Sequence, residues 1–360
     1  MNRVKRNKYS VIDLFSGCGG SAEGFRRAGF NVKAAVDSNT TASESFRANF
    51  PDAYVFSDRI ENISGKEIMN KGKISDPDTT VILSCPPCQG FSSARRVSQR
   101  MTDDRNKLVY EFVRMVEEIK PIAFVMENVP GMVGPMGKKL FDKAIGRLKK
   151  AGYTKIIYDV FQVIEYGVPQ KRKRLVVIGT RNNSINLQFP QKTHGEKENG
   201  KHQYVTVRQA ISDLPKLKAG EKSHKDPLHV SSGLSDMNME RLLNTKPDGG
   251  DRSTWPKRLI LPCHRDKDVH PDTYCRMWWD RPSPTITGGS MMISKGRFGH
   301  PVQNRGISLR EAARLQTFPD TYIFKGNNGQ IALQIGNAVP VAFAEKIAGS
   351  LHKSLALVHG

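Results

Sequence analysis

The first half of the chain alternates short apolar runs with segments of helical periodicity, and this alternation limits the folds that are open to it. The runs that read as strands cover residues 10–15, 31–37, 53–58, 79–84, 122–128 and 174–180. Helical spacing is present over residues 21–29, 40–50 and 107–120. Strands that alternate with helices favour parallel pairing through crossover helices. The sequence therefore predicts an α/β fold built on a parallel, doubly wound sheet.

The pattern changes after about residue 182. Residues 204–305 are rich in Gly, Pro, His and Lys and show no clean strand–helix rhythm. Helical patterning returns at Leu309, and residues 335–357 read as one closing helix. We predict one domain formed by residues 1–184 together with 306–360, and a second, smaller and irregular domain over residues 185–305.

A glycine-rich turn, GCGG, follows the first predicted strand and supplies Gly17, Gly19 and Gly20. Asp37 ends the next strand and Asp58 ends the third. Glycines let a backbone approach a ligand closely, and a carboxylate at the end of the second strand can accept hydrogen bonds from ribose hydroxyls. Asp58 is placed for an adenine amino group. The pattern indicates a nucleotide-like cofactor. Two alternatives stay open: the chain could be a dehydrogenase that binds a dinucleotide, or the turn could bind no ligand.

Reactive side chains follow two further predicted strands. Cys88 comes directly after Pro87, beyond the strand at residues 79–84, and Glu127 lies near the end of the strand at residues 122–128. Open α/β sheets bind their ligands at the carboxyl ends of the strands. A thiol and a carboxyl at that edge suit nucleophilic catalysis with acid assistance.

The number of cysteines indicates the cellular compartment in which the protein is expected. The 360 residues include five cysteines, which is a small and odd number. We therefore expect no secreted disulfide framework and a reduced, cytoplasmic protein. Cys85 and Cys88 could still form a redox pair. No apolar run approaches the roughly 18 residues that span a membrane, and no secretory signal is visible, so we expect no membrane association.

The charge balance points to a polyanionic partner. Lys and Arg number 56 against 35 Asp and Glu, which leaves a formal net charge of +21. Nucleic acid is the simplest partner for such a surface, and a basic surface with no ligand is the alternative.

Six short motifs resemble those of the DNA cytosine carbon-5 methyltransferases, in their order and their spacing. They are DLFSGCGG (13–20), PPCQGFS (86–92), ENV (127–129), QKRKR (170–174), REAARLQTFP (310–319) and QIGNAVP (334–340). RMWWDRPSPTIT (276–287) also resembles the end of the target-recognition region in that family. The resemblance covers nearly the whole chain except about residues 185–270. It implies a Rossmann-like S-adenosylmethionine-dependent methyltransferase sheet, with target recognition assigned to residues 185–305.

The resemblance also implies a catalytic mechanism. Cys88 would add to carbon 6 of cytosine, which makes carbon 5 nucleophilic. Glu127 would engage ring nitrogen 3 and the exocyclic amine, Arg174 the carbonyl oxygen, and Arg172 would help to hold the site. Cys85 occupies a position at which the family often has glycine, so it would be a bystander.

S-adenosylmethionine is the cofactor that the resemblance implies. The positions that match cofactor-contacting positions of the family are Phe15, Gly17, Asp37, Asp58, Pro87, Leu108 and Asn337. Gly19 and Gly20 belong to the same glycine-rich turn.

Double-stranded DNA is the partner that the resemblance implies. A cytosine inside a duplex must be rotated out of the stack before its ring can react. Residues 90–106 suit a loop that closes over the flipped base, and Arg95, Arg96 and Arg100 are candidates for phosphate contacts. Thr285 resembles a threonine that lies near the target phosphate in the family. We expect a monomer, and whether a cognate restriction endonuclease accompanies it stays open.

Other functions remain open from the sequence. A relative of the same fold could methylate cytosine in transfer RNA, and a catalytically silent relative could act as a DNA-binding regulator. The intact Cys88, Glu127 and Arg174 argue against a silent protein. Cys263, His264, His270 and Cys275 offer zinc-ligand types at an unusual spacing, and we expect no metal there.

Overall fold

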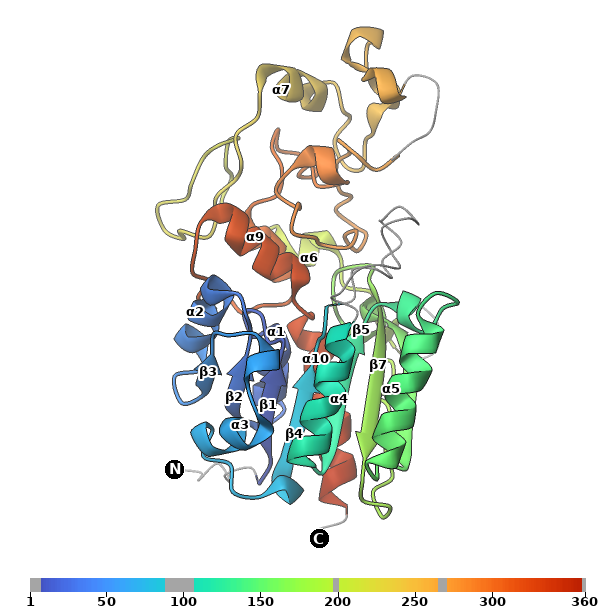
Figure 1. Ribbon diagram of the computed structural model, residues 1–360. Helices are drawn as coiled ribbons and strands as arrows, with labels where there is room; N and C mark the ends of the chain where they lie inside the picture. The colour runs from blue at the N-terminus through green and yellow to red at the C-terminus, as the bar shows by residue number, and fades with distance from the viewer. Residues whose placement is uncertain (1–7, 88–106, 197–200, 265–270, 358–360) are drawn as a thin grey trace. The chain divides into compact units, whose positions relative to one another are not determined.

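The structure is a computed structural model that describes residues 8–87, 107–196, 201–264 and 271–357, without the side chain of Cys263 (Figure 1). The chain divides into two compact units. The first is formed by Met1–Val163, Lys173–Gln191 and Val341–Gly360. The second is formed by Ile164–Arg172 and Lys192–Pro340. The second unit thus takes in residues 306–340, which the sequence analysis grouped with the sheet, and the assignment of functions to the two domains stays a prediction.

A seven-stranded sheet forms the centre of the first unit, in the order β3-β2-β1-β4-β5-β7-β6. The strands are β1 (Ser10–Leu14), β2 (Asn31–Val36), β3 (Tyr54–Phe56), β4 (Thr80–Ser84), β5 (Ala123–Asn128), β6 (Lys155–Gln162) and β7 (Lys173–Thr180). The first five pair in parallel, whereas β7 runs antiparallel to both β5 and β6. The α/β fold with a mostly parallel sheet is confirmed, and only the antiparallel direction of β7 differs from the predicted parallel pairing. No crossover helix joins β6 to β7, and strands joined without a crossover pair antiparallel.

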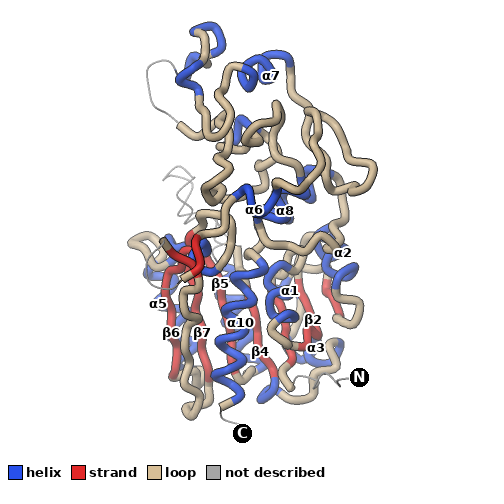
Figure 2. Tube along the Cα trace, turned by 180° about the vertical axis from the view of Figure 1, so that it is seen from behind, coloured by secondary structure: helices blue, strands red, loops and turns tan. Residues whose placement is uncertain are grey.

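Helices cover both faces of this sheet. They are α1 (Gly20–Arg27), α2 (Thr40–Asn49), α3 (Gly65–Lys71), α4 (Leu108–Ile119), α5 (Lys138–Lys150) and α10 (Val341–Ala356). Short 3-10 turns lie at Ile60–Asn62, Pro77–Thr79, Pro130–Met132 (η6) and Val163–Tyr166. α1 packs on α10 behind the sheet, and α4 packs between α3 and α5 in front of it (Figures 1 and 2). None of the helices in the described part of the chain combines the length and apolarity needed to cross a bilayer.

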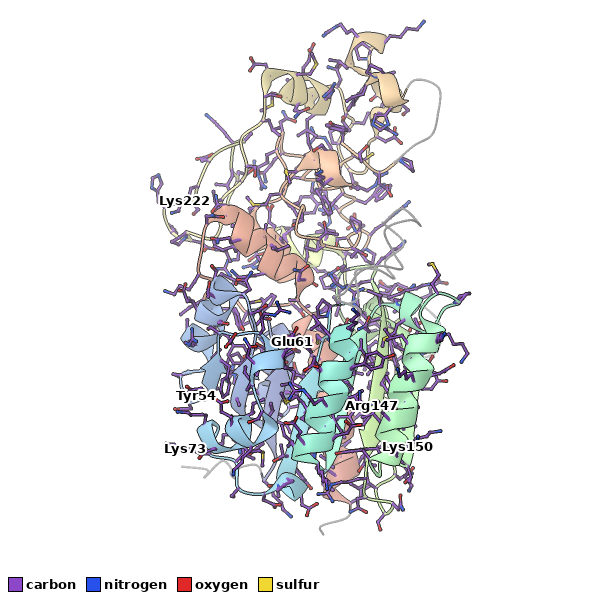
Figure 3. The ribbon with its side chains drawn as sticks, in the orientation of Figure 1. Tyr54, Glu61, Lys73, Arg147, Lys150 and Lys222 are labelled. Carbon is purple, nitrogen blue, oxygen red and sulfur yellow. The ribbon has the colours of Figure 1, made fainter. Side chains whose placement is uncertain are left out.

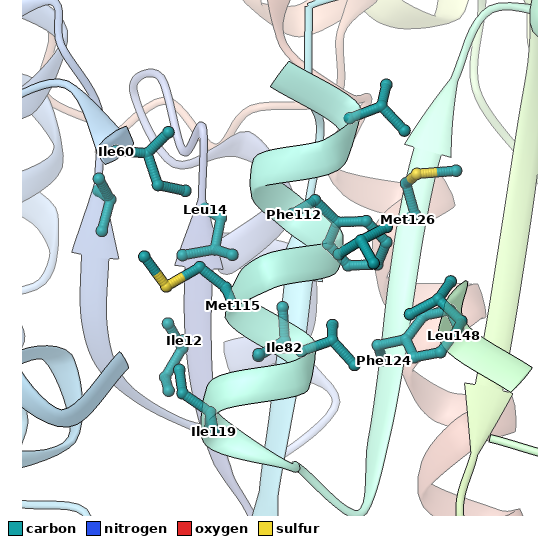
Figure 4. Close-up of a cluster of buried hydrophobic side chains, with 14 of the residues drawn as sticks. Ile12, Leu14, Ile60, Ile82, Phe112, Met115, Ile119, Phe124, Met126 and Leu148 are labelled. Atoms are coloured by element: carbon teal, nitrogen blue, oxygen red, sulfur yellow. The ribbon is translucent and has the colours of Figure 1, made fainter. Parts of the chain in front are cut away.

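The main hydrophobic core lies between the sheet and α4 (Figure 4). Ile12 and Leu14 of β1 contribute to it together with Phe112 of α4 and Phe124 of β5. Each such buried side chain contributes about 1.5–3 kcal/mol relative to an exposed one. Side chains alternate along a strand, so Asp13 points to the opposite face of the sheet, where α1 lies.

The chain order in the sheet reverses beside β1. The chain goes from β1 to β2 on one side, and β4 later pairs with β1 on the other side, with Leu14 opposite Ser84. Ligands of open α/β sheets bind at the carboxyl ends of the strands at such a reversal. The turns that follow β1 and β4 are therefore neighbours at the place where a ligand is expected.

The second unit contains little regular structure. Its elements are β8 (His194–Gly195), β9 (His202–Gln203), α6 (Val207–Ile211), α7 (Asp236–Leu243), α8 (Leu309–Leu315), α9 (Asn328–Asn337) and 3-10 turns at Arg252–Thr254, Lys257–Leu259, Pro262–His264 and Ile293–Lys295. α8 packs on both α6 and α9. Capping boxes begin α6, α8 and α9.

The predicted closing helix at residues 335–357 is wrong, because the segment belongs to two helices. α9 ends at Asn337 and α10 begins at Val341. Pro340 has no backbone N–H, and it disfavours the helical conformation at the residue before it. The apolar periodicity continues across this break, which is why the sequence pattern alone concealed it.

Candidate active site

The turn after β1 has a backbone that favours glycine. Gly17 and Gly19 adopt positive φ angles of 54° and 92°, and Phe15 adopts one of 56°. Gly19 precedes α1 in the left-handed conformation, and Gly20 is the first residue of that helix. A left-handed φ costs glycine little, whereas a side chain makes it unfavourable. This geometry turns the backbone sharply from β1 into α1 at the carboxyl edge of the sheet.

Asp37 binds this turn to the end of β2. Its Oδ2 accepts a hydrogen bond from the Gly17 amide at 2.7 Å, and its Oδ1 accepts one from the Asn39 amide at 2.8 Å. Burial raises the pKa of the Asp37 carboxyl, although the two amides act in the opposite direction. Each carboxylate oxygen keeps a lone pair, so the side chain can also accept from a ligand hydroxyl.

The other predicted cofactor positions of the first unit are less enclosed. Asp58 is exposed after β3, and its Oδ1 accepts from the Arg59 amide and from Asn62 Nδ2 at 2.9 Å. Phe15, Pro87 and Leu108 are half-buried, and Phe15 and Leu108 pack against the edge of the main core. These residues can offer apolar surface to a ligand, and their contacts with a cofactor stay predictions.

A buried carboxyl lies beneath the turn. Asp13 is fully buried, and its Oδ2 accepts a hydrogen bond from Ser21 Oγ of α1 at 3.2 Å. Asp13 Oδ1 and the nearby Ser16 Oγ have no hydrogen-bond partner within the described structure. Burial raises the pKa of Asp13 well above its usual value, against the effect of the Ser21 hydroxyl. Asp13 was not predicted as a site residue, although a lone acid inside a buried apolar strand is a signal that could have identified it.

The turn after β4 is clamped from both sides. The Cys85 amide donates to the Leu14 carbonyl at 3.2 Å, which extends the β1–β4 ladder. Asn128 Nδ2 donates to the Pro86 carbonyl at 3.0 Å, and Asn128 Oδ1 accepts from the Val129 amide at 2.8 Å. The second residue of ENV therefore fixes the backbone that leads to Pro87. This role of Asn128 was also missed, since only its place in the motif singles it out.

Cys88, the predicted nucleophile, lies outside the described residues, as do Arg95, Arg96 and Arg100. Cys85 is described, and burial, together with the negative charges of Glu127 and Asp13, raises the pKa of its thiol well above the usual value. A protonated thiol is a weak nucleophile. The environment of Cys85 therefore favours its interpretation as a bystander.

Glu127 and Arg174 form an ion pair at the end of β5. Arg174 Nε lies 2.5 Å from Glu127 Oε1, and the two side chains keep only 15% and 13% of their exposure. The guanidinium also donates from one terminal nitrogen to the Lys173 carbonyl at 2.8 Å. The structure therefore brings together two of the four predicted catalytic side chains, and a planar donor and a carboxylate are presented side by side.

Arg172 belongs to the second unit, where it is almost fully buried. One of its terminal nitrogens donates to the carbonyls of Ile286 and Gly336 at 3.0 and 3.1 Å. Thr285 Oγ1 donates to the Lys171 carbonyl at 2.7 Å. Arg172 therefore joins three segments of the unit, and its part in the catalytic site stays a prediction. Thr285 is engaged with protein backbone, and its DNA contact stays a prediction as well.

Gln170 of the second unit also takes part in these contacts. Gln170 is fully buried, its Oε1 accepts from the Ile286 amide at 2.8 Å, and its Nε2 donates to Gln316 Oε1 at 2.8 Å. Asn337, the last residue of α9, is exposed, and its cofactor contact stays a prediction. Gln170 was not predicted individually as a site residue, although it begins the QKRKR motif.

The His and Cys residues near residue 270 are only partly described. Cys275 is buried, and its thiol donates to the Pro271 carbonyl at 3.2 Å. The Cys263 side chain and His270 lie outside the described residues. Over the rest of the chain that the structure covers, no group of three or more His, Cys, Asp or Glu side chains could hold a metal ion.

Comparisons with known proteins agree on one family. The family model for C-5 cytosine-specific DNA methylases matches residues 9–353. The chain is 36% identical to the type II methylase M.HgiDII of Herpetosiphon aurantiacus, with 97% of each chain covered. It is also 36% identical to the type II methyltransferase M1.HphI of Haemophilus parahaemolyticus, over 96% of this chain and 87% of that protein.

A solved structure gives the same result. It is described as a DNA modification methyltransferase encoded within a prophage of E. coli. The two chains superpose with a TM-score of 0.74 at 27% identity, and the match covers 97% of this chain and 99% of the other.

Proposed function

The chain belongs to the C-5 cytosine-specific DNA methylases, and from that premise we propose that it transfers a methyl group from S-adenosylmethionine to carbon 5 of a cytosine within a specific short sequence of double-stranded DNA. The family and the relatives make the chain a DNA cytosine-5 methyltransferase of the type II restriction–modification kind. The methyl donor, the covalent step through Cys88, base flipping and the specificity for a short sequence are the proposal.

The Glu127–Arg174 ion pair is the observation that carries this proposal. It lies at the carboxyl end of β5, next to the clamped turn that leads to Cys88. In the proposed reaction the Cys88 sulfur bonds to carbon 6, and the electron pair of the carbon 5–carbon 6 double bond becomes available at carbon 5. Glu127 protonates ring nitrogen 3, and Arg174 donates to the carbonyl oxygen on which negative charge develops.

Bound S-adenosylmethionine would supply an electrophilic methyl group at carbon 5. Loss of the carbon 5 proton then restores the double bond and breaks the bond between carbon 6 and sulfur, which releases Cys88 as a thiolate. Ring nitrogen 3 returns its proton to Glu127 in the same step. Atoms and charges balance, because the proton that leaves carbon 5 replaces the positive charge of the transferred methyl group. Water is the simplest acceptor for that proton.

The first unit has groups that fit the cofactor. Asp37 fixes the glycine-rich turn and keeps lone pairs for the ribose hydroxyls. Asp13 Oδ1 and Ser16 Oγ are buried polar atoms without a protein partner in the described structure, and such atoms are usually satisfied by water or a ligand. A polar molecule at this turn would explain them. The half-buried Phe15, Pro87 and Leu108 would then enclose the apolar parts of the cofactor.

The substrate side of the proposal rests on charge and on the family. A duplex cytosine must leave the stack before Cys88 can reach its ring. Arg95, Arg96, Arg100 and Thr285 are the proposed DNA contacts, and the net charge of +21 favours a polyanionic substrate. The type II names of the relatives suit a companion restriction endonuclease. We propose that the protein acts as a monomer in the cytoplasm.

Covalent trapping tests the proposed mechanism. A pool of random-sequence DNA duplexes containing 5-fluorocytosine is incubated with S-adenosylmethionine and separated under denaturing conditions. Fluorine cannot leave carbon 5 as a cation, so elimination stops and the bond between sulfur and carbon 6 persists. We expect a covalent complex with the unaltered protein and with Cys85→Ser, and none with Cys88→Ser. A complex with Cys88→Ser, or none with the folded unaltered protein, would overturn the covalent mechanism.

A further inference from the structure

The loop that follows Glu127 and leads into α5 belongs to the first unit and is tightly folded. Met132 of η6 is fully buried in the main core. The amides of Gly137 and Lys138 both donate to the Gly134 carbonyl, at 3.0 and 2.9 Å. A Cβ atom on Gly137 would lie 2.4 Å from the Met132 carbonyl oxygen, so the loop depends on glycine at this position. The start of α5 is therefore held firmly beside the end of β5.

Exposed lysines from two elements meet this loop. Lys138 and Lys139 open α5, and Lys173 opens β7. β7 runs antiparallel to β5, so its first residue lies at the carboxyl end of β5, and η6 contacts both β7 and α5. Lys173 alternates with Leu175 and therefore points to the face of the sheet that α5 covers. We call Lys138, Lys139 and Lys173 the basic rim.

The basic rim has little local compensation for its charge. Lys138 pairs with Asp142 at 2.8 Å, but both side chains are more than half exposed, and such a pair is worth little. Neither Lys139 nor Lys173 takes part in an ion pair with another described residue. The first turn of α5 has no acidic residue, so its lysines meet the unfavourable end of the helix dipole. Among the described residues, the rim charges therefore have one weak favourable partner, Asp142.

The same rim carries apolar surface. Met136 keeps 45% of its exposure although it is a large apolar side chain. Its loop continues directly from β5, which carries Glu127. Lysines beside an exposed thioether suit a ligand with anionic groups and short apolar stretches between them, which describes the phosphates and deoxyriboses of a DNA strand.

We propose that the basic rim binds phosphates of the substrate DNA beside the target cytosine, an inference that rests on the proposed function. The rim would hold the duplex while Glu127 and Arg174 engage the extruded base. Each phosphate contact releases condensed counterions, so the rim contributes to affinity and to its salt dependence and not to sequence specificity.

A pair of matched double variants tests this proposal. Lys139→Gln with Lys173→Gln removes two rim charges. Lys149→Gln with Lys150→Gln removes two exposed charges at the other end of α5, where Figure 3 labels Lys150. Binding to a random-sequence DNA duplex is measured by fluorescence anisotropy at several salt concentrations. We expect the rim variant to flatten the slope of log affinity against log salt by about 0.9 for each lost contact, and the control to leave it unchanged. Equal slopes for the two variants would overturn the proposal.

Steady-state methylation separates this proposal from the proposed function. The rim variant should raise KM for DNA and leave kcat at saturating DNA within about twofold of the unaltered protein, because the rim acts on binding alone. A loss confined to kcat would overturn it. If the unaltered protein transferred no methyl group, that result would count against the proposed function. The salt slopes would still show whether the basic rim binds DNA phosphates. Parallel binding to a structured RNA distinguishes the sources of phosphate, and a rim effect confined to RNA would overturn the assignment to DNA.

Discussion

Arg174 Nε lies 2.5 Å from Glu127 Oε1, across two strands that run in opposite directions. β5 ends near Glu127 and β7 begins near Arg174, so the antiparallel pairing is what places both side chains at one edge of the sheet. An entirely parallel sheet would have put the start of β7 at the opposite edge. The departure from the predicted sheet is thus the feature that assembles this part of the site.

Glu127→Gln should slow the chemical step by orders of magnitude, because the amide cannot deliver a proton to the cytosine ring. Cofactor affinity should change little, since Asp37 and the glycine-rich turn carry the proposed cofactor contacts. Single-turnover methylation and equilibrium binding of S-adenosylmethionine measure the two effects separately. Unchanged turnover would rule out the role of Glu127 as an acid.

Arg174→Lys should lower kcat although the positive charge is kept. A lysine ammonium is a compact charge and cannot present the planar set of donors that Arg174 offers to a carboxylate and a carbonyl together. We expect a loss of about 10- to 100-fold, which corresponds to one charge-assisted hydrogen bond of about 1.5–3 kcal/mol. Arg147→Lys, an exchange in an ion pair on α5, is the control and should leave kcat unchanged.

Asp37→Asn should weaken S-adenosylmethionine binding by about 10- to 100-fold. The exchange removes the charge that accepts the Gly17 and Asn39 amides, and charged hydrogen bonds of this kind are worth about 1.5–3 kcal/mol. Asp58→Asn should cost less, because Asp58 is exposed. Isothermal titration of both variants with the cofactor measures the difference. An equal or larger loss for Asp58→Asn would contradict the central position given to Asp37.

Asp13→Asn should be increasingly more stable than the unaltered protein as the pH rises. Burial raises the pKa of Asp13 in the folded state, so its contribution to stability is complete below the unfolded pKa of about 3.9 and is lost as the pH rises through the folded value. Asparagine keeps the acceptor for Ser21 and does not titrate. The Tm difference between variant and unaltered protein should therefore grow as the pH rises above about 3.9, the unfolded value. A constant difference would show that Asp13 does not titrate in this way.

Arg276→Lys should destabilise the second unit by about 3 kcal/mol or more. Arg276 is buried and donates to the carbonyls of Thr245, His300 and Leu242, among others, and burial lowers its pKa to about 10. A lysine cannot reach these acceptors together, so buried carbonyls lose their donors. Urea unfolding measures the cost. The exposed Arg258→Lys is the control, and a similar small effect for both variants would contradict this account.

The sequence was informative where a local pattern has one meaning. The strands at β1, β2, β4 and β5 and the helix at α4 were predicted closely, since each is an apolar run or a clear helical stripe between turn residues. β6 was not predicted, because it is an edge strand whose side chains are mostly exposed or half-buried. The direction of β7 was not predictable either, since pairing direction depends on the connection before it and not on the composition of the strand.

The candidate site shows the same limit. The motifs singled out Glu127 and Arg174, which form an ion pair in the structure, and they singled out Asp37, which accepts a hydrogen bond from Gly17. They could not show that Asn128 clamps the Pro86 carbonyl or that Asp13 is left with an unpartnered oxygen. Those roles arise from contacts between segments far apart in the chain. Cys88 and the arginines after it lie outside the described residues, so their assignments stay predictions.

The most direct test of the central claim is a map of 5-methylcytosine at single-base resolution across the genome of a bacterium that lacks cytosine methylation and expresses this protein. The account predicts methylation confined to cytosines within one short sequence, and none when the expressed protein is Cys88→Ser. An unmodified genome, from a folded protein in the presence of its cofactor, would contradict it.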